Sequence, residues 1–458
     1  MVSSQKEINM LEGSLWDKIL RFALPLAVTG ILQQLFNAAD IAVVGRFTGE
    51  NGALAMAAVG ANTPVIGLIL NLFIGISLGS NVIIAHAVGR RDSVSIEKVV
   101  HTSVTFAVLI GVVIAALGEL GAEAILSTQK VPDEVLPLAL LYFRVYMTGL
   151  PVILLYNFES AVFRGLGQPK IPLIALFLSG LLNVLLNLLF VVGLHRTVDG
   201  VAAATVLSNL VSSVILMVFL LRAGGPARLQ WRKLGLDGRI LGRILRIGIP
   251  AGLQSAVFAF ANIIIQTAIN SLGTTVMAAS SAAFNVEIFA YYVLNSFSQA
   301  CTTFVGQNTG AGKIRRCKKA MGLCMIEGTV ALAITVALIL LFGRRILSVF
   351  NADPQVIEIG YIRLVVIFSA YIFTLSYEVI SGYMRGFGIS VTPALLTMLS
   401  ICGTRITWIW VVFPHNPTFG NIMTVYPISL AATAAVMLVA LLLLRPGAKR
   451  MSSVRAAG

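Results

Sequence analysis

Residues 33–40 read Gln-Gln-Leu-Phe-Asn-Ala-Ala-Asp and form the polar tip of an apolar run that begins near Leu15. Asp40 is the first carboxylate that the chain places inside an apolar segment long enough to cross a membrane. A charged side chain there costs roughly 2.5–3.5 kcal/mol on insertion scales, so it faces a protein interior and is usually functional. Asn37 lies one helical turn earlier and offers a second oxygen on the same face. The alternative is a helix-end aspartate that reaches headgroup water.

Composition defines the class of protein. Hydrophobic residues make up 57% of the chain, charged residues only 11%, and mean hydropathy is +0.91, which predicts a polytopic membrane protein. The net charge of +14 does not indicate nucleic acid, because the basic residues lie between apolar runs. The four cysteines show no ligand spacing and are expected to be apolar fillers. The first run is long enough to be a retained helix rather than a cleaved signal.

Twelve apolar runs approach the roughly 20 residues that a membrane-spanning helix needs. We therefore expect an all-α membrane protein with twelve transmembrane helices. The runs fall near residues 14–40, 53–85, 95–121, 134–158, 171–194, 198–222, 240–271, 276–305, 317–341, 355–383, 391–413 and 420–444.

Basic residues predict the orientation, because they accumulate in cytoplasmic loops. With the N-terminus inside, 25 of the 33 Lys and Arg residues fall on the inner side. Both termini are then cytoplasmic. Of the other eight, five fall outside and three lie within helices. The outer ones are Arg46, Lys130, Arg196, Arg344 and Arg345, and those within helices are Arg144, Arg363 and Arg405.

The two halves of the chain repeat each other. Residues 164–167, Arg-Gly-Leu-Gly, recur as Arg-Gly-Phe-Gly at 385–388, and Tyr156 recurs as Tyr377, with the same offset for every matched position. Six helices per half give a parallel repeat, which suits alternating access between two lobes. We expect an N-lobe over 1–222, a cytoplasmic linker over 223–239, and a C-lobe with a basic tail over 240–458.

Several motifs in the right order resemble the multidrug and toxic compound extrusion (MATE) transporters of the bacterial branch. The resemblance covers about residues 14–445 and rests on residues 34–40, 45–47, 156–158 with 164–167, 305–313, and Glu378 with 385–386. It implies a two-lobed, twelve-helix antiporter in the bacterial inner membrane that exports cationic amphiphiles in exchange for H⁺ or Na⁺. It also implies a monomer in contact with lipid, with no cofactor, no nucleic-acid partner and no enzymatic activity.

The N-lobe candidate site is centred on Asp40, with Asn183, Asn187 and Thr205 as companions. Related transporters often have an Asp at the position of Asn187, so this chain offers one carboxylate with neutral oxygens. Such a set suits Na⁺ at Asp40 or a protonated Asp40. The alternative for Asn183 and Asn187 is hydrogen bonding between helices.

The C-lobe candidate is Glu287, close to mid-membrane, as a coupling or cargo-facing carboxylate; the alternative is a structural partner for a buried polar group. Further candidates for cargo binding or coupling are Asn285, Tyr291 and Glu378 and, from the first helix, Gln34 and Asn37. Glu159 and Glu378 are expected to pair with Arg164 and Arg385 in an inner gate or as structural ion pairs. Arg405 with Trp408 is expected to be a structural anchor, and Glu327 a helix contact.

Two other functions compete with cation export. A flippase for lipid-linked precursors needs cationic cavity residues, whereas this chain places acids in its midplane. A membrane receptor would need a soluble signalling domain, and none is predicted. The sequence contains no P-loop or nucleophilic triad to support an ATP-driven or enzymatic activity.

The orientation gives a direct test. Single cysteines placed in the loop at residues 313–319 should react only with reagents that reach the cytoplasmic side, because the loop holds five basic residues. Labelling of these cysteines from outside intact cells would reverse the predicted topology.

Overall fold

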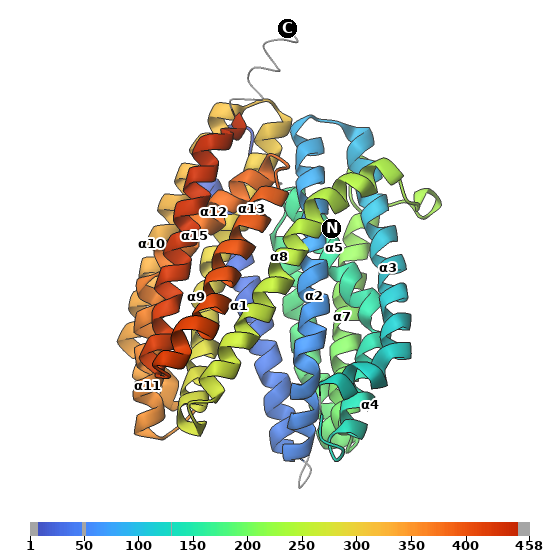
Figure 1. Cartoon of the computed structure of the whole chain (residues 1–458). Coiled ribbons are helices and arrows are strands. Elements are labelled where there is room, and N and C mark those ends of the chain that lie inside the picture. Colours follow the sequence, from blue (N-terminus) through green and yellow to red (C-terminus); the bar gives the residue numbers. More distant parts are fainter. Residues whose placement is uncertain (1–7, 48–51, 130, 448–458) are drawn as a thin grey trace. The chain divides into compact units, whose positions relative to one another are not determined.

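The computed structural model describes residues 8–47, 52–129 and 131–447, and every regular element within these ranges is a helix (Figure 1). Five basic residues used in the orientation argument lie outside them. These are Lys6, Lys130, Lys449, Arg450 and Arg455.

Ten helical segments in the described ranges are long and apolar enough to cross a membrane, and two bent pairs raise the number to twelve if each pair is one span. This confirms the predicted all-α fold with twelve spans in two pseudo-symmetric lobes. The first half contains α1 (Trp16–Phe47), α2 (Gly52–Gly89), α3 (Ser93–Thr128), α4 (Leu136–Thr148), α5 (Leu150–Gly165), α6 (Lys170–Leu188) and α7 (Val198–Leu221). The second half contains α8 (Gly238–Asn270), α9 (Thr274–Gly310), α10 (Ile314–Ser348), α11 (Pro354–Ser369), α12 (Tyr371–Gly386), α13 (Val391–Thr397), α14 (Thr404–Thr407) and α15 (Phe419–Leu444).

The two bent spans break at equivalent places. The α4–α5 pair bends by 49° at Gly149, and the α11–α12 pair bends by 46° at Ala370, which is the matched position of the repeat. At each break the backbone N–H donates to the carbonyl three residues back, from Gly149 to Tyr146 and from Ala370 to Ile367, both at 3.1 Å. The tighter i→i−3 bond ends the first helix of each pair. Only the first break is followed by a proline, Pro151, which has no backbone N–H to donate.

In the part of the chain that the structure describes, three wider π-helical turns interrupt the spans. One follows α6 at Leu189–Gly193, and two lie in the span of α13 and α14, at Met398–Gly403 and Trp408–Val412. Short 3₁₀ turns complete the secondary structure, at Gly225–Ala227, Trp231–Lys233 and Phe413–His415.

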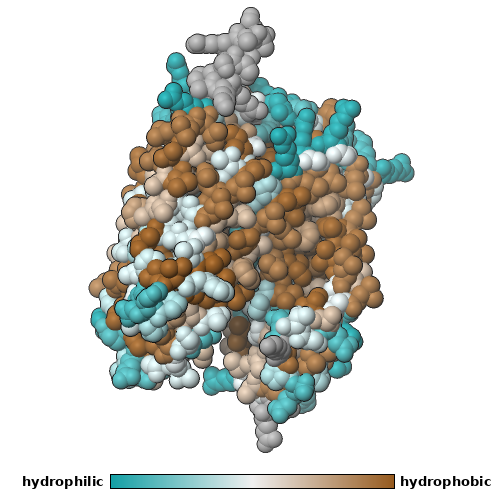
Figure 2. Space-filling view, viewed as in Figure 1, coloured by the Kyte–Doolittle hydropathy of each residue, from teal (hydrophilic) through white to brown (hydrophobic). Residues whose placement is uncertain are grey.

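The surface fits a lipid environment. On the face shown in Figure 2, apolar side chains cover most of the middle of the helices, including α10 and α15 in one half and α2 and α3 in the other, while hydrophilic side chains gather at helix ends. Leu341 and Leu443 are exposed examples at 75% and 76%. In water such a surface would promote aggregation, whereas in hydrocarbon it costs nothing.

The chain packs as two compact units. Among the described residues, unit 1 contains Val28–Gly248, and unit 2 contains Ile8–Ala27 with the chain from Ile249 onward. The boundaries fall inside α1 and α8, close to Pro25 and Pro250, where a proline removes one helical hydrogen bond. Each unit has its own apolar core. The lobe limits predicted from the sequence, 1–222 and 240–458, therefore differ from the packing limits, and they stay a prediction.

The repeat is visible in the backbone of each unit. Gly167 and Gly388 both have a left-handed φ, at 84° and 83°. A side chain on Gly165 would meet the Asn81 carbonyl and Ile84 in unit 1, and one on Gly386 would meet the Thr302 carbonyl and Val305 in unit 2. Every partner is shifted by the offset of the sequence repeat, so the repeat specifies the same helix contact twice.

The linker predicted over 223–239 packs against unit 1. The backbone N–H of Gln230 donates to His101 Nε2 at 3.0 Å, and Lys98 Nζ lies 2.9 Å from Asp237 Oδ2. The hydrogen bond from Lys98, with backbone N–H groups at the start of α8, holds the pKa of Asp237 below its ordinary value. Leu229 is fully buried in the core of unit 1. The linker and the first part of α8 thus belong to unit 1.

Gly79 allows α2 to contact α8 within unit 1, because a Cβ there would overlap the Ile244 carbonyl. We predict that Gly79→Ala lowers the free energy of unfolding by about 1–3 kcal/mol, the usual cost of overpacking. Thermal unfolding in detergent measures it. Gly67→Ala is the matched control on the same helix, since open space surrounds Gly67. Equal stability of both variants would contradict this contact.

Candidate functional site

Asp40 lies within a continuous helix and not at its end. α1 runs on past Asp40 to Phe47. The sequence boundary near residue 40 was therefore too short, and the alternative of a helix-end aspartate loses its structural basis. The helix continues because residues 41–44, Ile-Ala-Val-Val, are apolar and need no turn.

Asp40 is held by an amide and a hydroxyl from two other helices of unit 1. Asn187 Nδ2 on α6 donates to Asp40 Oδ1 at 2.5 Å, and Thr205 Oγ1 on α7 lies 3.3 Å from Asp40 Oδ2. Asn187 Nδ2 also lies 3.2 Å from Asn183 Oδ1. The structure therefore brings together the four residues that were predicted as one cluster.

The close approach of α1 and α6 depends on a missing side chain. A Cβ on Gly180 would overlap the ring of Phe36, so glycine lets this ring lie directly against α6. Asn183 and Asn187 follow on the same helix and reach Asp40. The π-helical turn begins just after Asn187, at Leu189. Such turns are frequent at functional sites.

The cluster has the donor set of a site for a small hard cation or a proton. It contains the two oxygens of Asp40, two amide oxygens and one hydroxyl. The Asn187 Oδ1 atom is buried and accepts no hydrogen bond within the described chain. A buried acceptor without a donor is costly. The residues present thus fit a bound Na⁺ or a proton on the carboxyl group. The site is formed entirely within unit 1.

Two residues from the first helix are not brought to this cluster. Asn37 is exposed, and Gln34 is half-buried. The described hydrogen bonds to Asp40 come from Asn187 and Thr205, and not from Asn37 or Gln34. Their cargo-binding role stays a prediction.

Glu287 in unit 2 is part of a buried ion pair. Arg363 Nη2 on α11 donates to Glu287 Oε2 at 3.1 Å, and the Tyr371 hydroxyl donates to Glu287 Oε1 at 3.3 Å. Arg363 Nη1 donates to Ser280 Oγ at 2.6 Å. The exposed fractions are 9% for Glu287 and 3% for Arg363. Sequence reasoning noted an arginine within this helix and missed that it neutralises Glu287.

The other predicted acids have local partners. Glu378 Oε2 accepts from Ser298 Oγ at 3.2 Å and lies 3.9 Å from Arg385 Nη2, so the predicted pairing with Arg385 is a distant one. Glu159 is fully buried and accepts from Ser213 Oγ at 3.0 Å.

Asn285 and Tyr291 do not complete a site around Glu287. Asn285 Nδ2 donates to the Ser281 carbonyl of its own helix at 3.0 Å. The ring of Tyr291 contacts the ring of Tyr292, with centres 6.3 Å apart. Their part in cargo binding stays a prediction.

Arg405 is a buried cation with neutral partners. Its Nη1 donates to Asn262 Oδ1 at 3.0 Å, and its Nε donates to Ser429 Oγ at 3.3 Å. Its guanidinium carbon lies 4.6 Å from the centre of the Tyr426 ring, a cation–π contact. Trp408 Nε1 donates to Asn421 Oδ1 at 2.9 Å. These contacts join α8, α14 and α15 within unit 2.

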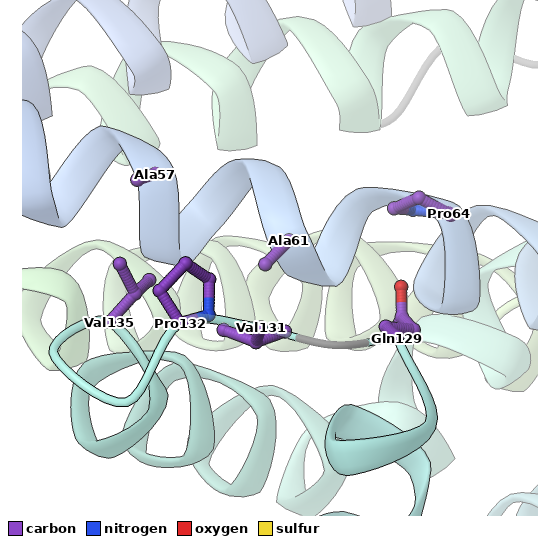
Figure 3. A pocket seen from close by; sticks show the side chains of 7 residues that line it. All are labelled: Ala57, Ala61, Pro64, Gln129, Val131, Pro132 and Val135. Carbon is purple, nitrogen blue, oxygen red and sulfur yellow. The ribbon is translucent and has the colours of Figure 1, made fainter. Parts of the chain in front are cut away.

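A cavity of about 250 Å³ opens in unit 1 between the first half of α2 and the chain that joins α3 to α4 (Figure 3). Its described lining residues are uncharged, so it does not have the chemistry of a cation site. They are Ala57, Ala61, Pro64, Gln129, Val131, Pro132 and Val135. Within the described ranges, no group of three or more His, Cys, Asp or Glu residues is placed to hold a metal ion.

Comparison with known proteins identifies the family. Similar proteins include the probable multidrug resistance protein YoeA of Bacillus subtilis, 27% identical over 86% of both chains, and the probable multidrug resistance protein NorM of Thermotoga maritima, 28% identical over 85% of this chain and 84% of the relative.

Solved structures share the fold. An outward-facing MATE transporter of the MOP superfamily has a TM-score of 0.87 at 22% identity, covering 99% of this chain and 100% of the other. A Pyrococcus furiosus transporter, described as having a binding pocket of reverse polarity that suggests a different function, has a TM-score of 0.87 at 23% identity and 99% coverage of both chains. The MatE family model matches residues 25–189 and 250–411, once in each half. The chain thus belongs to the MATE family of multidrug efflux transporters.

Proposed function

We propose that this transporter exports organic cations by alternating access, in exchange for a proton or sodium ion that enters the cell. The observation that carries the proposal is the Asp40 carboxylate, held by Asn187 and Thr205 inside an apolar lobe. Relatives named multidrug resistance proteins support the choice of cargo class. The chain would act in the bacterial inner membrane as a monomer with both termini in the cytoplasm.

Exchange requires that cargo and ion compete for the same charge. An ionised Asp40 attracts a cation strongly, because the surrounding lobe screens charge poorly. A proton or Na⁺ on Asp40 cancels that charge, so the lobe releases cationic cargo when the ion binds. When the ion leaves toward the cytoplasm, the carboxylate is restored and cargo is attracted again. Each occupant thereby displaces the other.

Protons are the favoured coupling ion. Asn187 is neutral, so a Na⁺ in this cluster would have a single carboxylate ligand. A proton needs only that one carboxyl group. Sodium stays the alternative, because Asn187 Oδ1 is an acceptor without a donor in the described chain.

A second candidate is the flipping of an anionic, lipid-linked precursor. One observation favours it: unit 2 buries Arg363 and Arg405, and the partners of Arg405 are the neutral Asn262 and Ser429. A buried cation with neutral partners attracts an anionic group. This candidate predicts transport of a lipid pyrophosphate and little transport of organic cations.

We predict that Asp40→Asn strongly lowers gradient-driven efflux without unfolding the protein. Loss of a coupling free energy of about 1–3 kcal/mol would lower efflux by about 5- to 150-fold. The measurement uses proteoliposomes, a fluorescent organic cation, and pH and sodium gradients imposed separately. A pH gradient alone should drive the wild type.

The matched control is Asp133→Asn, which changes an exposed aspartate of the same unit and should transport normally. Undiminished efflux by folded Asp40→Asn protein would remove Asp40 from the mechanism. Efflux driven by sodium alone would change the coupling ion but not the site.

A further prediction concerns Glu287, which we proposed as the coupling or cargo-facing carboxylate of the C-lobe. Arg363→Leu should lower the free energy of unfolding by about 3–5 kcal/mol, because it leaves Glu287 buried without a countercharge. The double variant Glu287→Leu/Arg363→Met should regain most of this stability. Thermal unfolding and cation efflux are measured on both. Normal efflux by the double variant would show that Glu287 holds the lobe together and carries no coupling.

A further inference from the structure

His101 on α3 uses both nitrogens of its ring in hydrogen bonds, one of them to the linker over 223–239. Its Nε2 accepts from the backbone N–H of Gln230 at 3.0 Å, and its Nδ1 lies 2.7 Å from the backbone carbonyl oxygen of Glu97, one helical turn earlier. A backbone N–H group can only donate, and a carbonyl oxygen can only accept. Nδ1 therefore carries the proton, Nε2 carries none, and the ring is neutral while the linker is docked.

This contact belongs to a docking face at the start of α3, which binds the linker that lies beside it (Figure 1). The face consists of Glu97, Lys98, His101 and Thr102. Their spacing of i, i+1, i+4 and i+5 gives two adjacent rows on one side of the helix. Thr102 Oγ1 accepts from the backbone N–H of Asp237 at 3.2 Å. Two neighbouring side chains of α3 thus each accept a backbone N–H of the linker.

Burial distinguishes His101 within the docking face. The Lys98–Asp237 and Lys233–Glu97 ion pairs, at 2.9 and 2.8 Å, also join α3 to the linker, but their side chains are 26–53% exposed. Water screens such pairs, so they contribute little to docking. His101 is only 3% exposed, and Leu229 of the linker is buried in the core of unit 1. These two residues are therefore the buried centre of the docked linker.

A proton on Nε2 of His101 is incompatible with this contact. The protonated ring has two donors and no acceptor, so its Nε2–H would face the N–H of Gln230. Both groups would then lack a partner, and a positive charge would be buried with them, which is costly. The linker has to move away before the ring can hold a second proton. Docking and proton uptake therefore oppose each other.

Other charged and titratable groups lie on the elements that pack against α3. The arginines stay ionised throughout the physiological pH range and act as fixed cations that disfavour a further positive charge. One histidine and one buried glutamate can change charge, so variants have to distinguish them from His101. Besides the two ion pairs above, the groups toward the linker are His86 of α2, Glu159 and Arg164 of α5, and Arg228 and Arg232 of the linker itself.

We propose that His101 is a pH-sensitive latch, which holds the linker on unit 1 while the ring is neutral and releases it when the ring is protonated. Histidine side chains ordinarily gain a proton near pH 6.5. The docking free energy that depends on the neutral ring is thus fully present above about pH 6.5 and is lost as the pH falls below that value.

The latch acts on a stretch of chain that leads from one unit to the other. Asp237 Oδ1 accepts from the backbone N–H groups of Arg239 and Ile240, at 3.0 and 3.1 Å, and so caps the start of α8. α8 begins on unit 1 and passes into unit 2 at Ile249. Release of the linker would free the segment before α8 from α3. This inference goes beyond the proposed function, because it needs neither cargo nor Asp40.

Hydrogen exchange of the full chain in detergent tests the latch. Backbone amides of residues 228–237 are followed at about pH 5.5 and about pH 7.5, with rates corrected for the intrinsic effect of pH. We expect wild-type exchange to be faster by about tenfold or more at the lower pH, because one buried hydrogen bond is lost. Amides of residues 201–216 in α7 should keep their protection at both pH values, since the change is local.

Two substitutions hold the latch in opposite states. His101→Gln keeps an acceptor, because the amide oxygen of glutamine can take the place of Nε2, and the linker should stay protected at both pH values. His101→Leu removes the acceptor, and the linker should exchange fast at both pH values. The leucine variant alone serves if His101→Gln does not fold.

His415→Gln is the matched control. The Nδ1 of His415 likewise lies 2.7 Å from a backbone carbonyl oxygen four residues earlier, that of Val411, but this histidine is exposed and belongs to unit 2. His86→Gln tests the histidine of the neighbouring helix, where the repeat places Gln307 at the matched position. Both control variants should keep the pH dependence of the wild type.

Equal protection of the wild-type linker at both pH values would overturn the proposal. A pH dependence that survives in either His101 variant, or that disappears in His86→Gln or His415→Gln, would belong to another group and would overturn it as well. Faster exchange of α7 at the lower pH would show general unfolding in place of a latch. No transport is measured, so failure of the proposed function would leave the result unchanged.

Discussion

Inside an apolar lobe, a carboxylate is balanced either by a protein side chain or by a bound cation or proton. Asp40 receives one short hydrogen bond from Asn187 and a longer contact from Thr205, and neither partner carries a positive charge. The packing of unit 1 keeps the Asp40 carboxylate in this state, with hydrogen bonds but without a countercharge. Gly180 lets α1 approach α6, and the helix continues past Asp40 to Phe47. A site that is complete only with a bound cation or proton is suited to exchange.

The two units use one scaffold for opposite chemistry. The same glycine contacts and the same helix break occur in both, at matched positions of the repeat. Three buried charged residues of unit 2 do not repeat: Glu287, Arg363 and Arg405 correspond to Ile66, Tyr142 and Val184 at the offset that relates Arg164 to Arg385. Unit 1 therefore offers the Asp40 carboxylate without a cation, whereas unit 2 offers Arg405 with neutral partners in addition to the Glu287–Arg363 ion pair.

Sequence patterns predicted the spans and the Asp40 cluster well, because apolar length and helical spacing are local properties. Asn183 and Asn187 are one helical turn apart, so their spacing in the sequence predicts that they share one face of the helix. The Glu287–Arg363 pair was missed because its members lie far apart in the sequence, on α9 and α11, and no repeat marks them. The packing of Ile8–Ala27 on unit 2 was missed for a similar reason. Hydropathy shows where a helix forms, but not which unit its first turns pack against.

Proton release on cargo binding shows whether Asp40 exchanges its proton for cargo. A fluorescent organic cation is added to the detergent-purified transporter in a weakly buffered solution, and the released protons are counted with a pH indicator. We expect about one proton to leave per bound cation in the wild type and none to leave in Asp40→Asn. Equal release by both proteins, or cargo binding by the wild type without any release at all tested pH values, would contradict a carboxyl group at Asp40 that exchanges its proton for cargo.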